Sequence, residues 1–167
     1  MFCVKSKPAR GSTKAAPVSK IGSRVRKTWR SKLADDKDLP KVLELDGIRA
    51  ARWGGRTMVI ARTRDVDQLI RGIRKGRTAT INDLRRQLAE AHGTETACPI
   101  TTGIFAWIAA HAAAEDEADG KKRVTPWWRV LKDGDKLNPK YPGGVEDQAR
   151  RLRAEGHPVE RGRVIRD

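Results

Sequence analysis

The chain has 167 residues, which suits one domain with a tail, and its 36 Lys and Arg residues outnumber 21 Asp and Glu residues to give a net charge of +15. No run of about 18 apolar residues occurs, and no apolar stretch follows the first basic residues, so we expect neither a membrane span nor a secretory signal. The isolated Cys3 and Cys98 and the unclustered His92, His111 and His157 predict no disulfide, no metal site, no cofactor and a reducing, cytoplasmic setting.

The first segment, residues 1–28, is expected to be a disordered basic arm. Residues 1–32 hold ten basic side chains and no Asp or Glu, whereas the remaining 26 basic residues face all 21 acidic ones, a net of about +5. A chain rich in Ser, Gly and Pro cannot bury enough apolar surface to offset its ordering entropy. Because Lys and Arg release counterions from phosphates, the arm predicts a polyanionic partner. The alternative is an extension that only improves solubility.

The second segment, residues 29–62, is expected to lead into the fold with irregular structure or short strands. The folded part should begin near Trp29 to Leu33. Thr57–Ile60 is the best strand candidate because three of its four residues are β-branched. Residues 63–167 form the predicted main domain.

Helical periodicity begins at Val66 and continues with apolar residues at spacings of three and four as far as Ile73, which predicts a helix ending at Gly76. Thr80 is the expected N-cap of the next helix. Its apolar face is formed by Ile81, Leu84, Leu88 and Ala91, and Gly93 lies just past its expected end.

A third helix should start at Thr101 or Thr102, which could cap it, and run through a strongly apolar stretch towards the acidic residues 115–119. Two helices joined by a short link are compatible with a helix-turn-helix, a pattern that also occurs in many domains that bind no DNA. We therefore expect a mostly α fold of winged helix-turn-helix type with a small β element.

The character of the sequence changes after Lys121. Trp127 and Trp128 are expected on an extended segment, where they would point to opposite faces and at most one would be deeply buried. The turn Tyr141–Gly144 should open a helix that stops at Gly156, and residues 159–165 should form a small hairpin around Arg161 and Gly162.

Four sequence segments, taken in chain order, make the functional prediction more specific. They are the helix Val66–Ile73 with Lys75-Gly76 and Thr80–Leu84; Thr101-Thr102-Gly103; Pro126-Trp127-Trp128-Arg129-Val130; and Tyr141-Pro142-Gly143-Gly144 with Gln148, Leu152 and Glu155-Gly156. Residues 64–157 thereby resemble the C-terminal domain of the 6-O-alkylguanine-DNA alkyltransferases, including the non-catalytic alkyltransferase-like proteins. The resemblance implies binding to duplex DNA, including alkylated DNA, in a repair context with a repair-protein partner, and we expect a monomer.

The resemblance also assigns roles to residues. It implies a DNA-binding helix at Thr101, Thr102 and Gly103 and backbone contacts from Thr80 and Asn82. The implied lesion pocket consists of Pro126, Trp127, Trp128, Arg129, Tyr141, Gly143, Gly144 and Glu155. In this pocket the indoles could stack on an extruded base, which is worth about 1–3 kcal/mol.

Several residues differ from the family's pattern at positions that the alkyl-transfer reaction needs. Trp127 stands where the family has its alkyl-accepting cysteine and Trp128 where it has the histidine base, and an indole replaces neither group. Ile81 and Ile100 stand at the positions of a tyrosine and an arginine that assist base flipping. The resemblance therefore favours DNA binding over base flipping and over alkyl transfer.

Three hypotheses remain open. The first is a DNA-binding protein that recognises alkylated guanine without transferring the alkyl group. The second is an active alkyltransferase that uses Cys98, whose place before a helix could lower its thiol pKa, although a small buried cysteine is the simpler reading. The third is a sequence-independent nucleic-acid-binding protein in which Trp127 merely fills the old pocket, and both tryptophans could equally be ordinary core residues.

Overall fold

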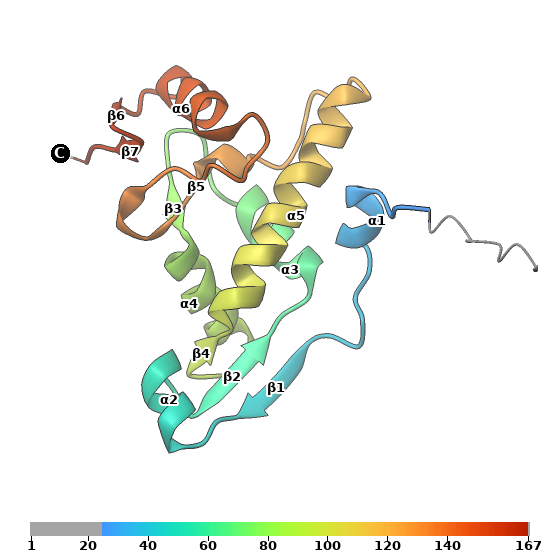
Figure 1. The fold of residues 1–167 in the computed structure, drawn as a ribbon, viewed down its shortest axis with the longest axis vertical. Coiled ribbons are helices and arrows are strands. Elements are labelled where there is room, and N and C mark those ends of the chain that lie inside the picture. The colour runs from blue at the N-terminus through green and yellow to red at the C-terminus, as the bar shows by residue number, and fades with distance from the viewer. Residues whose placement is uncertain (1–24, 167) are drawn as a thin grey trace, which may run out of the picture.

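The computed structural model describes residues 25–166, and about half of these are helical (Figure 1). The α-helices are α1 (Trp29–Leu33), α2 (Gly47–Trp53), α3 (Thr63–Arg71), α4 (Ile81–His92), α5 (Pro99–Ala118) and α6 (Gly144–Ala154). The strands are β1 (Lys41–Glu44), β2 (Thr57–Ile60), β3 (Ala79–Thr80), β4 (Thr96–Ala97), β5 (Val130–Leu131), β6 (Val159–Glu160) and β7 (Arg163–Val164). The expected arm lies outside the described residues apart from residues 25–28, so its disorder stays a prediction.

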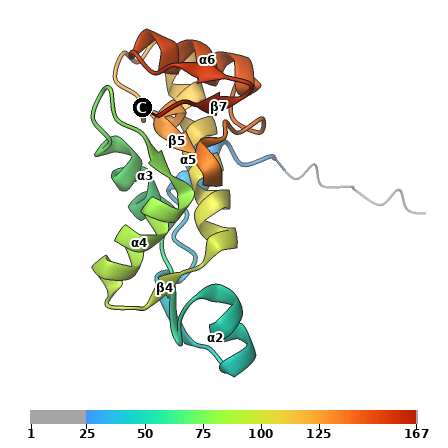
Figure 2. The same cartoon turned by 90° about the vertical axis from the view of Figure 1, so that its left-hand side faces the viewer.

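The long helix α5 is the element around which the others are arranged. Helices α1, α3 and α4 pack against it, and the short 3₁₀ turn Trp127–Arg129 contacts both α5 and α6. In Figure 1 the α6 end of the molecule lies above and the β1–β2 pair below, and Figure 2 shows α3 and α4 together on one side of α5. No described helix is long and apolar enough to cross a bilayer.

Three small sheets connect these helices. Strand β2 pairs antiparallel with β1, with Lys41 opposite Ile60, and parallel with β4, with Met58 opposite Thr96. Strand β3, just before α4, pairs parallel with β5, just after the 3₁₀ turn. The hairpin β6–β7 follows α6, as the Arg161-Gly162 turn predicts. The structure thus has a mostly α fold with small β elements.

Helix α4 has the ends that its sequence predicts. Thr80 is the N-cap, and its hydroxyl accepts a hydrogen bond from the Asp83 amide at 3.2 Å while the Asp83 carboxylate accepts one from the Thr80 amide at 2.8 Å. This reciprocal pair is a capping box. Gly93 ends the helix with a φ of 63°, a left-handed conformation that glycine adopts without a steric penalty.

Helix α5 starts earlier than expected, and Thr101 and Thr102 are not its caps. Cys98 is the N-cap and Pro99 the first helical residue. Proline suits this position because the first turn needs no intrahelical donor from its nitrogen. The Thr102 hydroxyl instead donates to the carbonyl of Cys98 at 2.7 Å, inside the first turn.

Two further boundaries differ from the expectation. Helix α3 ends at Arg71 and not at Gly76, although Ile73 still packs against the core. The lead-in segment contains two unexpected helices, α1 and α2, capped by the side chains of Thr28 and Asp46. Neither helix has a buried residue, so hydrophobic periodicity carried no signal for them. The predicted strand at Thr57–Ile60 is confirmed.

The main core lies between α3, α4, α5 and the 3₁₀ turn. It consists of Val59, Ala61, Val66, Ile70, Ala79, Leu84, Leu88, Ala97, Ala106, Ala109, Ala110, Ala113, Trp127, Val130 and Tyr141. A second cluster beneath the C-terminal hairpin consists of Leu131, Leu137, Ala149, Leu152, Val159 and Val164. Trp128 packs against both clusters and so connects the main core with the cluster beneath the C-terminal hairpin.

Candidate functional site

The segment Trp127–Arg129 forms one 3₁₀ turn and not the extended segment that we expected. With about three residues per turn, consecutive side chains point roughly a third of a turn apart instead of to opposite faces. Trp127 points inward and is 0% exposed, whereas Trp128 and Arg129 are only partly buried. The expectation that at most one indole is deeply buried is therefore confirmed, with a different backbone as the reason.

Trp127 is held by aromatic rings and a cation. Its ring centroid lies 5.9 Å from that of Trp128 and 5.7 Å from that of Tyr141, both in edge-to-face geometry. The Arg151 guanidinium carbon lies 5.1 Å from the Trp127 ring and 4.8 Å from the Trp128 ring. Because Trp127 has no exposed surface, its indole offers no face on which a nucleobase could stack in this conformation.

One polar atom of Trp127 lacks a partner. Its indole Nε1 is buried and makes no hydrogen bond within residues 25–166. A buried donor without an acceptor lowers stability, so packing and the nearby Arg151 guanidinium hold this ring, and no hydrogen bond does.

The neighbouring Trp128 takes part in a polar cluster with Glu155. The Trp128 Nε1 atom donates to Glu155 Oε1 at 2.9 Å, and Arg129 donates to the same carboxylate through Nε and a terminal nitrogen at 2.8–3.1 Å. The Gly76 amide donates to Oε2 at 3.3 Å, and Arg129 also donates to the carbonyl of Ile73. The cluster ties α6 to the 3₁₀ turn and to the loop after α3.

These contacts alter the acidity of Glu155. Burial by itself raises the pKa of a carboxyl group, but hydrogen bonds from Arg129, Trp128 and Gly76 outweigh burial and hold the pKa of Glu155 below its ordinary value. Glu155 is therefore a charged carboxylate whose oxygens are already engaged, which is the opposite of a proton acceptor poised near neutral pH.

The loop before α6 closes over the buried indole. Tyr141 is buried, and burial raises the pKa of its phenol above the ordinary value. Gly143 has a φ of 71°, and a Cβ there would lie 2.5 Å from the Cβ of Asp147, so this turn requires glycine. Gly144 opens the helix, and the fully buried Gln148 binds the loop by accepting from the Asn138 amide at 2.8 Å.

All eight residues of the predicted lesion pocket thus lie in or around one region. The structure brings Pro126, Trp127, Trp128, Arg129, Tyr141, Gly143, Gly144 and Glu155 to the junction of the 3₁₀ turn with both ends of α6. Whether this region recognises a lesion stays a prediction. Its centre is packed by protein side chains.

The residues expected on the DNA-binding face differ in how far they are exposed to solvent. Thr102 is 2% exposed and hydrogen-bonded inside α5, so it presents no surface to a ligand. Thr101 and Thr80 are partly exposed, the latter inside its capping box, while Asn82 is exposed and accepts a hydrogen bond from Arg85 at 3.0 Å. Gly103 borders an open hollow.

That hollow has a volume of about 440 Å³ and lies between the helix pair and the chain after β5. Its lining residues are Ile81, Ile100, Gly103, Ile104, Trp107, Lys132, Asn138, Pro139 and Lys140. Ile100 and Ile104 are 61% and 46% exposed. Sequence reasoning missed Ile104, Trp107 and the two lysines as surface features, because the lysines reach α5 only through the tertiary fold.

The rim of this hollow is connected to helix α1. The Trp107 Nε1 atom donates to the carbonyl of Lys140 at 2.9 Å, and His111 Nε2 lies 3.2 Å from the same oxygen. The Trp29 ring stacks on His111 with centroids 4.6 Å apart and meets Trp107 edge to face. Helix α1, which follows the basic arm directly, is thereby fixed beside the helix pair.

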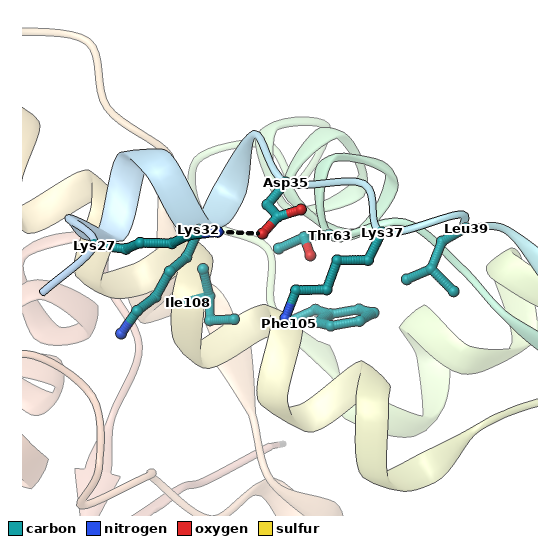
Figure 3. A pocket seen from close by; sticks show the side chains of 8 residues that line it. All are labelled: Lys27, Lys32, Asp35, Lys37, Leu39, Thr63, Phe105 and Ile108. Carbon is teal, nitrogen blue, oxygen red and sulfur yellow. Dashed lines mark hydrogen bonds and ion pairs between the residues drawn. The ribbon is translucent and has the colours of Figure 1, made fainter. Parts of the chain in front are cut away.

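A second hollow, of about 290 Å³, lies between the α1 segment and the other flank of α5 (Figure 3). Phe105 and Ile108 form an apolar floor, and Lys27 pairs with Asp35 at 2.9 Å. Figure 3 shows the Lys37 side chain extending to the Phe105 ring. Positive charge therefore borders α5 on this flank as well.

Cys98 lies at the start of α5 and is 6% exposed. Its amide donates to the carbonyl of Val59 on β2 at 2.9 Å, and its carbonyl accepts from Thr102. A cysteine with so little exposed surface cannot bring its thiol to an alkyl group on DNA unless the fold opens here.

A search for metal-ligating groups among the described residues and comparisons with known proteins gave no positive result. Within residues 25–166 no three His, Cys, Asp or Glu side chains are grouped so that they could hold a metal ion. Comparisons with protein-family models, with curated proteins and with solved structures found no match to the chain.

Proposed function

We propose that this protein binds duplex DNA through its α4–α5 face and basic arm, without alkyl transfer and without selecting alkylated guanine. The observation that carries the proposal is the complete burial of Trp127, at the position where the resemblance expects a reactive thiol, beside a helix pair that stays open to solvent. Of the three hypotheses from the sequence, this is the sequence-independent binding protein.

The helix pair supports the DNA-binding part of the proposal. Helices α4 and α5 pack against each other and are joined by a six-residue link, residues 93–98, as in a helix-turn-helix, with the β6–β7 hairpin as the candidate wing. Lys132 and Lys140 border the adjacent hollow, and no acidic residue lines it. A cationic rim next to an exposed helix suits the phosphates of a duplex.

The polar cluster of Glu155 supports the absence of alkyl transfer. Alkyl transfer to protein needs a strong nucleophile, and it is accelerated when a base removes the proton of that nucleophile. The indole nitrogen of Trp128 is a hydrogen-bond donor only, and Glu155 is bound to it and to Arg129. Neither partner can serve as a base while these contacts persist.

The same packing argues against lesion recognition at this position. A flipped base is recognised by stacking and by hydrogen bonds in a pocket that receives it. Here Trp127 packs edge to face against both Trp128 and Tyr141, so the base would have to displace a fully buried core ring. We therefore expect similar affinity for alkylated and plain duplexes.

The test is a paired binding measurement on the full chain. Fluorescence anisotropy with a labelled 20-base-pair duplex, with and without one 6-O-methylguanine, should give equal dissociation constants that rise steeply with salt. Intact-protein mass should be unchanged after incubation with the alkylated duplex. Lys132→Ala and Lys140→Ala should weaken binding, whereas Lys122→Ala beyond the other end of α5 should not.

Each result that differs from these expectations would overturn a different part of the proposed function. Failure to bind any duplex would refute the DNA-binding function, and a clear preference for the alkylated duplex would restore lesion recognition. A mass gain of one methyl group would show that Cys98 or another residue accepts the alkyl group, and Cys98→Ser would identify which.

A further inference from the structure

The loop between α3 and β3, residues 72–78, carries a concentration of positive charge and is called the basic loop below. Arg74, Lys75 and Arg77 are all exposed, and no acidic residue occurs within five positions of this group on either side. None of the three takes part in an ion pair within residues 25–166. Because like charges at this spacing repel one another, an anion that binds between them would stabilise the loop.

The backbone of the basic loop is held by contacts from the rest of the fold. Gly76 turns the chain with a φ of 75°, and its amide donates to Glu155 Oε2 at 3.3 Å. Arg129, which forms the largely buried ion pair with Glu155, donates to the carbonyl of Ile73. Figure 1 shows the loop beside α6, with β3 leading from it to α4. The cations are therefore presented by an ordered backbone, which lowers the entropic cost of binding a ligand.

The basic loop borders a third hollow, of about 370 Å³, whose polar side chains can all donate hydrogen bonds. These side chains are Gln68, Arg74, Arg77, Thr78 and Gln87, and no acidic residue of the described chain lines the hollow. The fork of an arginine guanidinium matches two oxygens of a phosphate, and amide and hydroxyl donors suit the remaining oxygens. The hollow therefore fits a phosphate group in both its charge and its hydrogen bonding.

The position of the basic loop favours a phosphate of the nucleic-acid backbone. Arg77 is four residues before Ile81, which lines the hollow beside α5, so an extended chain separates them by at most about 13 Å. Successive phosphates of one strand are about 3.4 Å apart along the helix axis. A duplex that extends past the α4–α5 face in this direction therefore presents phosphates to the loop within about four base steps. The hollow is open to solvent, which suits a long backbone better than a small molecule that needs enclosure.

We propose that Arg74 and Arg77 bind a phosphate of the duplex backbone, with Gln68, Gln87 and Thr78 completing the contact. This inference rests on the proposed DNA binding and adds a second attachment point beside the α4–α5 face. The contact is independent of base sequence, because a phosphate is the same at every step. It also fixes the orientation of the duplex, since two separate attachment points define a line across the protein surface.

The experiment measures the affinity of the full chain for the 20-base-pair duplex by anisotropy at several salt concentrations. The double variant Arg74→Gln with Arg77→Gln should bind about tenfold more weakly near physiological salt, because charged hydrogen bonds are lost. Its slope of log affinity against log salt should be shallower by about 0.9, the value for one phosphate contact. Lys122→Gln with Arg123→Gln removes the same charge from exposed residues after α5 and should behave as the wild type. Unchanged melting temperatures would show that both proteins keep the fold.

A second pair of substitutions separates a phosphate contact from general attraction by positive charge. Arg74→Lys with Arg77→Lys keeps both charges but replaces each planar fork by a point charge. This variant should restore the salt slope of the wild type while its affinity stays several-fold lower, because an ammonium group does not bind phosphate oxygens bidentately. Full wild-type affinity of the lysine variant would reduce the loop to general attraction and would overturn the proposed contact.

The outcomes distinguish this inference from the proposed function. If the wild type binds the duplex and the glutamine variant loses no more affinity than the control, the phosphate contact is wrong and the DNA-binding function stands. Titration calorimetry with sodium pyrophosphate tests the other source of a phosphate. Tight binding of pyrophosphate that needs both arginines, with unchanged affinity for the duplex, would assign the hollow to a free phosphorylated compound and overturn the backbone contact. If the wild type binds no duplex, both proposals fall together.

Discussion

The indole Nε1 of Trp128 donates a hydrogen bond to Glu155 Oε1 at 2.9 Å, across 27 residues of sequence. The Arg129 guanidinium donates to the same carboxylate from the next position in the chain. Two adjacent residues therefore hold one acid at the end of α6. Glu155, which the sequence resemblance associates with proton transfer, therefore acts as a structural contact between α6 and the 3₁₀ turn.

The strength of this joint can be measured with a double-mutant cycle. Trp128→Phe removes the indole donor, and Glu155→Gln removes the negative charge. Because a hydrogen bond to a charged group is worth about 1.5–3 kcal/mol, the two changes should show a coupling energy of this size in the free energy of unfolding by urea. Trp107→Phe combined with Glu155→Gln is the control pair and should be additive. Additivity of the Trp128 pair would mean that the bond contributes nothing.

The depressed pKa of Glu155 predicts a loss of stability in acid. A carboxyl group whose pKa is lower in the folded than in the unfolded state stabilises the fold above its ordinary value, about 4.5 here, and loses this contribution as the pH falls through the folded value. The free energy of unfolding of the wild type should therefore fall more steeply below about pH 4.5 than that of Glu155→Gln. Asp83 and Asp147 also have lowered pKa values and are common to both proteins, so the difference reports Glu155.

The capping box of α4 should contribute measurably to stability. Thr80→Ala removes the hydroxyl that accepts from the Asp83 amide and should lower the free energy of unfolding by about 1 kcal/mol. Thr80→Ser keeps the acceptor and should cost less than half of this. Chemical denaturation at neutral pH is sufficient, and equal losses for both variants would show that the hydroxyl is not what caps the helix.

Trp127 should behave as a core residue. Trp127→Ala should destabilise the protein by about 3–5 kcal/mol, because a fully buried indole leaves a cavity. Trp127→Phe should cost less than about 2 kcal/mol, since it keeps most of the ring and removes a buried Nε1 that has no hydrogen-bond partner within residues 25–166. Thermal unfolding followed by circular dichroism orders the variants. A Trp127→Ala protein of wild-type stability would point to a ring that is free to leave its site.

The basic arm should determine much of the salt dependence of DNA binding. Replacing Lys5, Lys7, Arg10, Lys14, Lys20 and Arg24 by Gln keeps the chain length and removes six charges. The slope of log affinity against log salt should become shallower by up to about 0.9 for each phosphate contact that is lost. The same number of changes in a matched set of exposed charges away from α5 gives the control, and an unaltered slope would exclude the arm from binding.

The sequence by itself determined the local features of this protein. The cap at Thr80, the left-handed Gly93, the strand Thr57–Ile60 and the C-terminal hairpin follow from side chains within a few residues, so they could be predicted and are confirmed. The start of α5 was missed because Thr101 and Thr102 resemble caps, whereas Pro99 takes the first helical position. Helices α1 and α2 were missed because short helices without a buried face leave no periodic pattern.

The tertiary structure decided the state of the Trp127-Trp128 pair. From the sequence, the pair could have been an open aromatic pocket or a filled core, because the local sequence does not say which ring Tyr141 and Arg151 will cover. The packing of α5, of α6 and of the loop before α6 against the 3₁₀ turn buries Trp127, and the position of α6 brings Glu155 to Trp128. The burial of a side chain depends on contacts from segments that are far apart in the chain, so it cannot be predicted from the residues next to it in the sequence.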